Sequence, residues 1–459
     1  MRDHGRAIFA MHAAQINDGQ METIPIRSHT LRAFIRNASV LFCATSTSVT
    51  LAAQTMPVRP LGPVLATATE PLGSVSQVRV LHGGRLIVND VTGRRVVMFD
   101  STLSRVTVVA DSTTATGTAY GSRLGGLIAY RGDSTLFVDP ASLSMLVIDP
   151  IGKIARTMAV PRPRDVQNLI GGPFGTPAFD GLGRLVYRAT PTVTLPKSGG
   201  AFVMPIQPES ALIVRFDLSS RALDTVAVFR IPKVVFNVVR DADAVRVIPT
   251  VNPIPLTDDW AVLSNGTVAI VRGREYRVEF VASDGKQTSP PKLPFDWQRL
   301  SDDEKVAVID STHAEMEKAR AAQLAQIAAA GSQPTLADSA PTARRQLAQA
   351  ESTISPVGRG SPSDVPPLPQ FVDPSELPDY RPAFRQGAAR GDADGNLWIR
   401  TTKFVNGGPV YDVVNQAGAL IDRIRIPPGR VIAGFGAGGV VYMGVVDGTV
   451  TRLERARVR

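Results

Sequence analysis

The chain has 459 residues, of which 44% are hydrophobic and 20% charged, and its formal net charge at pH 7 is +9. This is the composition of a globular protein, and no apolar run reaches the roughly 18 residues that a membrane span needs. The positive charges are spread along the chain, without a Lys/Arg-rich block or interleaved aromatic residues, which argues against a nucleic-acid partner.

Residues 1–53 have the layout of a leader for export. Translation starts at Met1 or Met21, three arginines precede a modest apolar stretch over 38–50, and small residues allow cleavage before Gln54. The single cysteine, Cys43, lies in this leader, so the mature protein has no disulfide and no cysteine-based metal site. We expect an exported protein, periplasmic or extracellular; the alternative is a basic N-terminal extension of a cytosolic protein.

After the leader, one unit recurs: a polar turn, an apolar strand, a connection, a second apolar strand, another turn and an outer strand. The copies occupy residues 83–109, 133–160, 180–231, 265–293, 392–426 and 440–453. A short strand precedes each copy, as at Val78–Leu81, which makes a four-stranded meander. Proline ends several outer strands, as expected at a sheet edge; these are Pro161, Pro232, Pro294 and Pro427.

These repeats predict an all-β fold, a six-bladed β-propeller. Its first four blades lie in residues 54–293 and its last two in 381–459, because the copies are spaced irregularly and the excess marks insertions. The last copy lacks an outer strand, so we expect the segment 61–67 to pair with Val450–Leu453 and close the ring.

The largest insertion, residues 294–380, is predicted to be helical and partly disordered. Ser301 is a helix N-cap and Gly331 ends the helix. The apolar residues on one face are Val306, Ile309, Met316 and Ile327. Residues 332–370 are rich in Ser, Pro, Ala and Gln, which is typical of a mobile tether.

Three of the copies carry the family resemblance. The segments GRLIVNDVTGRRVVMFD, STLFVDPASLSMLVIDPIGKI and DGNLWIRTT resemble blades of the six-bladed NHL and TolB-like propellers of exported bacterial proteins. That resemblance covers about residues 60–459 without the insertions, and the group includes protein-binding scaffolds, sugar-lactone hydrolases and lyases. It implies a fold rather than an activity, because no catalytic motif of the group is recognisable.

Neither a cofactor nor a metal site is predicted. Asp392-Ala393-Asp394-Gly395-Asn396 resembles the opening of a calcium loop, but the closing glutamate is missing and a β-turn explains the pattern equally. The mature chain keeps two histidines, His82 and His313, too few for a histidine-based zinc site. Calcium therefore stays as the alternative.

The long connections 161–175, 191–209, 233–258 and 294–380 all emerge on one face of the predicted disc. Loops on a rigid scaffold carry function, so we expect this face to bind a protein, a peptide or an anionic carbohydrate. The second strands end there in the residues that we predict as the site, with His82 at an inner-strand end as a further candidate; they are Arg188, Arg272, Arg400, Asn89 and Asp139.

Three guanidinium groups at a channel mouth suit a carboxylate, a sulfated sugar or an acidic peptide, although pairing with acidic loop residues is the alternative. The sequence therefore predicts a monomeric binding or scaffold module. The alternative function is a metal-assisted lactonase or another hydrolase, or a lyase, using residues of the channel.

Overall fold

The computed structural model describes residues 56–193, 207–240, 245–331, 368–448 and 450–458. Internal contacts divide the chain into two units, Met1–Gln54 and Thr55–Arg459, and all that is described belongs to the second. The predicted leader and residues 332–367 of the predicted tether lie outside the described residues. The described part has no helix long and apolar enough to cross a membrane.

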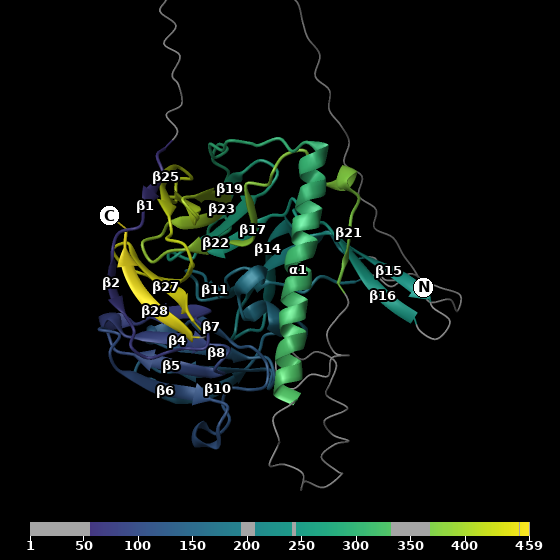
Figure 1. The fold of residues 1–459 in the computed structure, drawn as a ribbon. Coiled ribbons are helices and arrows are strands. Elements are labelled where there is room, and N and C mark those ends of the chain that lie inside the picture. Colours follow the sequence, from purple (N-terminus) through teal and green to yellow (C-terminus); the bar gives the residue numbers. More distant parts are fainter. Residues whose placement is uncertain (1–55, 194–206, 241–244, 332–367, 449, 459) are drawn as a thin grey trace, which may run out of the picture. The chain divides into compact units, whose positions relative to one another are not determined.

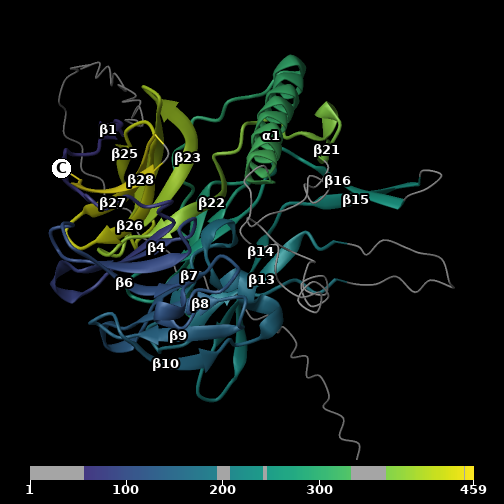
Figure 2. The same ribbon diagram turned by 60° about the horizontal axis from the view of Figure 1, so that its bottom comes forward.

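Six sheets of four or five strands make up most of the described chain, and we number them 1 to 6 in chain order (Figures 1 and 2). Sheet 1 comprises β3 (Gln77–Val80), β4 (Leu86–Asp90), β5 (Arg95–Phe99) and β6 (Val106–Asp111). Sheet 2 comprises β7 (Gly126–Ala129), β8 (Thr135–Asp139), β9 (Ser144–Ile148) and β10 (Ile154–Ala159). Sheet 3 comprises β11 (Ala178–Phe179), β12 (Leu185–Arg188), β13 (Ser210–Phe216) and β14 (Leu223–Arg230).

The last three sheets have the same antiparallel meander, to which an N-terminal strand is added in parallel at the edge of sheet 5. Sheet 4 comprises β17 (Asp259–Val262), β18 (Val268–Arg272), β19 (Arg277–Val281) and β20 (Gln287–Thr288). Sheet 5 comprises β22 (Phe384–Gly391), β23 (Leu397–Val405), β24 (Gly408–Val414), β25 (Leu420–Arg425) and the N-terminal β1 (Arg59–Pro60). Sheet 6 comprises β26 (Arg430–Gly436), β27 (Val440–Asp447), β28 (Val450–Arg457) and the N-terminal β2 (Val64–Thr67).

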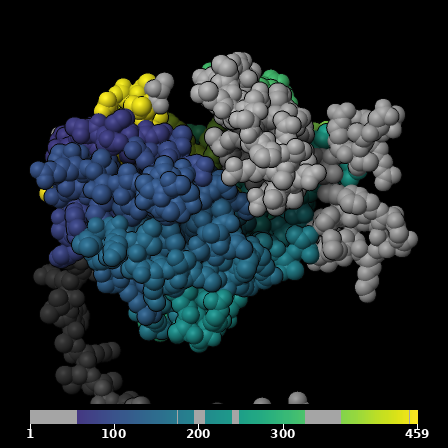
Figure 3. All heavy atoms as spheres, turned by 90° about the horizontal axis from the view of Figure 1, so that it is seen from below, coloured from purple at the N-terminus to yellow at the C-terminus, as the bar shows by residue number. Residues whose placement is uncertain are grey.

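The hydrophobic core lies between consecutive sheets. Six clusters of buried apolar side chains each join two neighbouring sheets, from the pair 1 and 2 to the pair 5 and 6. The sixth joins sheet 6 back to sheet 1 through Tyr442 and Leu453 packed with Val88 and Phe99. Figure 3 shows residues of sheets 1, 2 and 3 following one another across one surface. The sheets therefore form a closed ring.

The first strands of the six sheets, β3, β7, β11, β17, β22 and β26, surround one central cavity, which is the arrangement of a β-propeller. They approach closely: a Cβ atom on Gly434 of β26 would lie 2.5 Å from the carbonyl oxygen of Val78 on β3. Gly391 of β22 meets the carbonyl oxygen of Val262 in the same way, at 2.5 Å. Glycine is needed at both places because a side chain would push the inner strands apart.

The N-terminal segment completes the last sheet, as expected. β2 pairs antiparallel with β28, with Val64 opposite Ala456 and Thr67 opposite Glu454 (Figure 1). The partners lie nearer the end of β28 than the predicted residues 450–453, because the chain continues past β2 and Leu72 is the residue that bridges to Thr451.

Two parts of the insertions differ from expectation. The predicted loop 233–258 contains a hairpin of β15 (Val234–Arg240) and β16 (Val245–Val251). Residues 370 and 371, at the end of the predicted tether, form β21 (Gln370–Phe371), which pairs parallel with β16.

The outer strand of sheet 4 is shorter than expected. The sequence predicts it over 287–293, but it is only β20, because Pro290 and Pro291 cannot donate backbone hydrogen bonds.

The predicted helix is α1 (Asp302–Gly331), begun by Ser301 as expected. Of the predicted apolar face, Ile309 packs against a small cluster of Ile254, Leu300 and Leu377, together with Val308. Val306 of that face is 44% exposed. Short 3-10 turns connect the strands; they are η1 (His82–Gly84), η2 (Thr114–Thr116), η3 (Arg131–Asp133), η4 (Pro163–Leu169), η5 (Gly172–Phe174) and η7 (Pro374–Glu376).

Candidate functional site

The three predicted arginines have three different environments. Arg188 is buried, its guanidinium carbon lies 5.8 Å from the ring centroid of Phe229, and burial lowers its pKa. Arg272 forms ion pairs with Asp258 at 2.8 Å and Glu279 at 2.6 Å, which is the alternative that we held open for it. Arg400, on β23, is exposed.

The other predicted residues have contacts that support the fold. Asn89 is buried, donates to the carbonyl oxygen of Gly125 at 2.8 Å and accepts from the Tyr120 hydroxyl at 3.1 Å, which joins sheets 1 and 2. Asp139 accepts hydrogen bonds from Ala141 and Ser142 in the turn that follows it.

His82 lies at the opposite end of its sheet from Asn89, in η1, where its side chain is exposed. Its backbone N–H donates to Asp133 at 2.7 Å. None of the six predicted residues lines the central cavity of the described chain, and Arg272 lines a different pocket.

The central cavity is the candidate site. It has a volume of about 760 Å³ and is lined by residues of all six inner strands and by the segment that precedes η5. The lining is mixed: small and apolar residues such as Ala129 and Phe435 alternate with three arginines, Arg79, Arg131 and Arg390. Such a mixture is typical of ligand pockets, in which few polar groups fix the orientation of the ligand.

The three cavity arginines differ in their partners. Arg79 donates to Asp133 at 3.4 Å and to its neighbouring carbonyl oxygen, and burial lowers its pKa. The guanidinium of Arg131 lies beside Gly183 of the next sheet. Burial lowers the pKa of Arg390, and among the described residues its side chain makes no hydrogen bond or ion pair. Arg390 therefore faces the cavity with its hydrogen-bonding capacity free.

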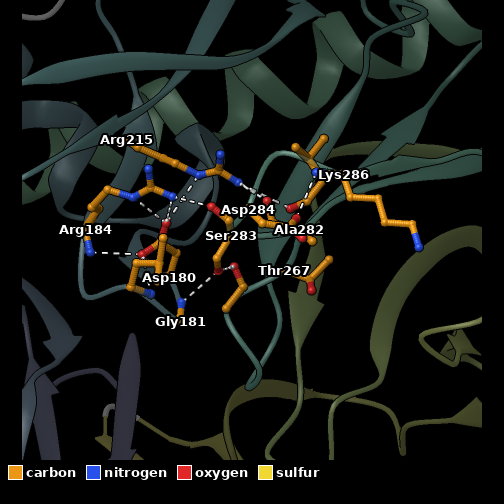
Figure 4. Close-up of polar contacts among 12 residues, drawn as sticks. Asp180, Gly181, Arg184, Arg215, Thr267, Ala282, Ser283, Asp284 and Lys286 are labelled. Atoms are coloured by element: carbon orange, nitrogen blue, oxygen red, sulfur yellow. Dashed lines mark hydrogen bonds and ion pairs between the residues drawn. The ribbon is translucent and has the colours of Figure 1, made fainter.

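One end of the cavity, where the first strand of each sheet turns into the second, is held together by contacts between sheets. Figure 4 shows the joint between sheets 3 and 4. Asp180 forms ion pairs with Arg184 at 2.7 Å and Arg215 at 3.3 Å. Arg215 also donates to the carbonyl oxygen of Ala282 at 2.6 Å, and Arg184 to that of Ser283 at 2.5 Å. The charge of Asp180 is thus compensated within the protein.

Polar contacts also join the next sheets at this end. Asn265 donates to Gln416 at 2.9 Å between sheets 4 and 5. Asp394 accepts from the backbone N–H groups of Gly438 and Gly439, at 2.9 and 2.7 Å, between sheets 5 and 6. Side chains at this end of the ring therefore hold neighbouring sheets together.

The calcium-like segment forms a turn. Asp392 accepts hydrogen bonds from the backbone N–H groups of Asp394 and Asn396, at 2.9 and 2.7 Å, and from the Trp398 indole at 2.9 Å. Across the described ranges, no group of three or more His, Cys, Asp or Glu side chains could hold a metal ion. We assign no metal ligand.

A buried carboxyl group lies at the start of β17, on the side of the long connections. The Asp259 side chain accepts from the backbone N–H groups of Trp260 and Ala389, both at 2.9 Å, and burial raises its pKa to about 6. Neither Asp259 nor Arg390 was predicted from the sequence. The sequence feature that could have indicated Arg390 is a lone arginine among small residues, Gly387 to Gly391, directly before the turn of a repeat.

Comparisons with known proteins give similarity to solved structures at low identity and low TM-score. No family model and no curated protein matches the sequence. Among solved structures, a gluconolactonase from Xanthomonas campestris is 12% identical with a TM-score of 0.36, over 87% of this chain and 99% of that one. Regucalcin, a calcium-binding protein from Agrobacterium tumefaciens, is 11% identical with a TM-score of 0.37, over 88% and 98%.

A third similar structure is virginiamycin B lyase from Staphylococcus aureus with quinupristin, 10% identical with a TM-score of 0.35, over 88% of this chain and all of that one. The β-propeller fold of this chain follows from its own six sheets and their closed core.

Proposed function

We propose that this protein is an exported six-bladed propeller, each of sheets 1 to 6 being one blade, and that it binds a ligand in its central cavity. The ligand enters from the face that bears the long connections. It is a protein, a peptide or an anionic carbohydrate. The carrying observation is the 760 Å³ cavity lined by all six inner strands, with the free guanidinium of Arg390 in its wall.

The topology supports the choice of face. Three of the long connections lead from the last strand of one sheet to the first strand of the next of the six sheets; they are 161–175, 233–258 and 294–380. The fourth, 191–209, links β12 to β13. In an antiparallel meander these links leave the sheet at the end where its first strand begins. Gly172 and Pro173 of η5 line the cavity at that end.

Export is supported by the division of the chain. The compact unit begins at Thr55, next to the cleavage position near Gln54 that the leader predicts. The NHL and TolB-like assignment and a monomeric state remain predictions from the sequence.

A substitution that fills the cavity tests the binding function. Ala129, on β7, is exposed and lines the cavity, so Ala129→Trp should exclude a ligand without disturbing the core. The probes are trigalacturonate, a sulfated heparin disaccharide and an oligo-glutamate peptide, with maltotriose and an oligo-glutamine peptide as uncharged counterparts. A ligand at about 100 times its dissociation constant stabilises the native state by about 2.7 kcal/mol, which is read as a rise in melting temperature.

We expect at least one probe to raise the melting temperature of the wild type and to lose this effect in Ala129→Trp. Ala417→Trp, in an exposed turn of sheet 5, is the matched control and should respond like the wild type. Binding that survives in Ala129→Trp, or no binding by any probe, contradicts the proposal.

A further inference from the structure

Two arginines lie on one face of sheet 5. Arg390 on β22 is opposite Trp398 on β23, and Arg400, two residues further along β23, is opposite Tyr411 on β24. Residues that face each other across a sheet project from the same side, and so do residues two apart along a strand. Arg390, Trp398, Arg400 and Tyr411 therefore share one side of the sheet.

The surroundings of this side are apolar. Trp398 and Tyr411 are buried together with Ile432 and Val441 of sheet 6, and Phe435 packs against the same cluster. Arg390 and Phe435 both line the central cavity. Burial lowers the pKa of Arg390, and the neighbouring charge of Arg400 acts in the same direction. A cation in such a place is costly unless an anion accompanies it.

The acids that the structure describes around Arg390 are all engaged elsewhere. Glu454, the acid of sheet 6 in this region, is held by Arg430 at 2.6 Å. The negative charge of Asp259 raises the pKa of Arg390. The oxygens of Asp259, however, accept backbone hydrogen bonds from Trp260 and Ala389.

The two acids of sheet 5 closest in sequence are also engaged. Asp392 accepts from the Trp398 indole at 2.9 Å. Asp412, on the opposite side of the sheet, is bound by Tyr276 at 2.7 Å and Arg423 at 3.1 Å. Within the ranges that the structure describes, neither Arg390 nor Arg400 has a hydrogen bond or ion pair from its side chain.

Four other arginines of this fold each form an ion pair with at least one carboxylate at 2.6 to 3.3 Å; they are Arg272, Arg215, Arg423 and Arg430. Arg390 and Arg400 differ from these four, and Arg390 opens onto the cavity. Guanidinium groups bind carboxylate, sulfate and phosphate oxygens through paired hydrogen bonds.

We propose that Arg390 and Arg400 form a site for the oxyanion of a ligand held in the central cavity, a carboxylate, sulfate or phosphate ester. Arg390 binds the oxyanion directly, and Arg400 and the Tyr411 hydroxyl complete the site from the same side of the sheet. The inference rests on the proposed binding function and names the charge that its ligand carries.

Four probes with one sugar ring separate the anion from the rest of the ligand: glucuronate, glucose 6-sulfate, glucose 6-phosphate and glucose. Each is titrated against the full chain, and the melting temperature is recorded. We expect at least one anionic sugar to raise the melting temperature and glucose to leave it unchanged. The anion that acts identifies the oxyanion class.

Two variants locate the effect. Arg390→Met removes a half-buried charge that has no ion pair among the described residues, so the ligand-free variant should melt higher than the wild type while losing its response to the anion. Arg400→Gln changes an exposed residue, keeps the fold intact and should weaken the apparent affinity several-fold. Arg105→Gln, at an exposed arginine directly before β6, is the control and should respond like the wild type.

The outcomes separate this site from the cavity function. An anion that stabilises Arg390→Met and the wild type equally overturns the oxyanion site, as does a wild type that responds to no anion beyond its response to glucose. A probe whose binding is lost in Ala129→Trp but kept in Arg390→Met leaves the cavity function standing without this site. Loss in Arg390→Met with an unchanged response in Ala129→Trp contradicts the proposed cavity function and, with it, an oxyanion site for a ligand held in the central cavity.

Discussion

Buried aspartates at the end of the long connections tie separate segments together. Asp90 accepts hydrogen bonds from the backbone N–H groups of Gly73, Ser74 and Gly93 at 2.9 to 3.0 Å. Asp165 accepts from the Thr190 N–H at 2.8 Å. A carboxylate with several N–H donors is stabilised as an anion, and the loops that supply the donors are held in place.

Asp259 differs from these residues because burial outweighs its hydrogen bonds and raises its pKa to about 6. The pKa of the folded state lies above the ordinary value of 3.8, so the folded protein holds this proton more tightly than the unfolded chain does. The stability that results is present at low pH and is lost as the pH rises from about 4 to about 6.

Asp259→Asn should remove this dependence on pH. The difference in free energy of unfolding between the wild type and the variant should fall by about 2 kcal/mol between about pH 4 and about pH 7. Urea unfolding across this range measures it. Asp284→Asn, at an exposed carboxyl group, is the control and should give a constant difference. A constant difference for Asp259→Asn would show that its pKa is not raised.

At the scale of elements, α1 is the largest addition to the ring. It contacts the rest of the chain through its first three turns, where Lys305 is buried and bound to Asp379 at 2.8 Å. Its start is a reciprocal cap: Glu304 N–H donates to the Ser301 hydroxyl at 3.3 Å, and Ser301 N–H donates to the Glu304 carboxylate at 2.8 Å. Most of its surface is exposed, so local interactions decide where it begins.

Ser301→Ala should loosen the start of α1 without affecting the sheets. Loss of a cap costs about 1 kcal/mol, which corresponds to roughly fivefold faster hydrogen exchange in the first turns of the helix. Exchange followed by mass spectrometry measures the effect for each segment. Ser311→Ala is the matched control, because the Ser311 hydroxyl bonds to Val308 within the helix. Faster exchange in the six sheets would contradict a local role for the cap.

At the scale of the whole ring, the two ends of the compact unit meet in sheet 6. The Ala68 N–H donates to the Leu453 carbonyl oxygen at 2.8 Å, and Leu72 and Thr451 exchange two backbone hydrogen bonds at 2.9 and 2.7 Å. Leu61 is buried in the cluster between sheets 5 and 6. The N-terminal segment thus covers the edge of β28, an edge that would otherwise be open to association.

Truncation tests this closure. A chain that starts at residue 69 should lose at least about 2 kcal/mol, the burial of Leu61 alone, and should aggregate through the edge of β28. A chain that starts at residue 54 is the control and should keep the full stability of the compact unit. Melting curves and size-exclusion chromatography compare the two. Identical melting of both chains would refute closure by the N-terminal segment.

Short-range patterns in the sequence were enough for the elements and their order. Apolar strands, polar turns and edge prolines recur within each copy, and each depends on neighbours a few residues apart. The cap at Ser301 and the closing segment before Thr67 were recognised for the same reason. The hairpin of β15 and β16 was missed, because its third strand, β21, comes from more than 100 residues further along the chain.

The candidate site was decided by the tertiary structure. The sequence placed Arg188, Arg272 and Arg400 at equivalent strand ends, yet the charges that surround an arginine come from other strands and sheets. Arg272 on β18 forms an ion pair with Glu279 on β19, and Arg188 packs against Phe229. Arg400 forms no ion pair with an acid within the described chain. Arg390 is a candidate because it lines the central cavity. A guanidinium group can bind a ligand when folding brings no carboxylate to it.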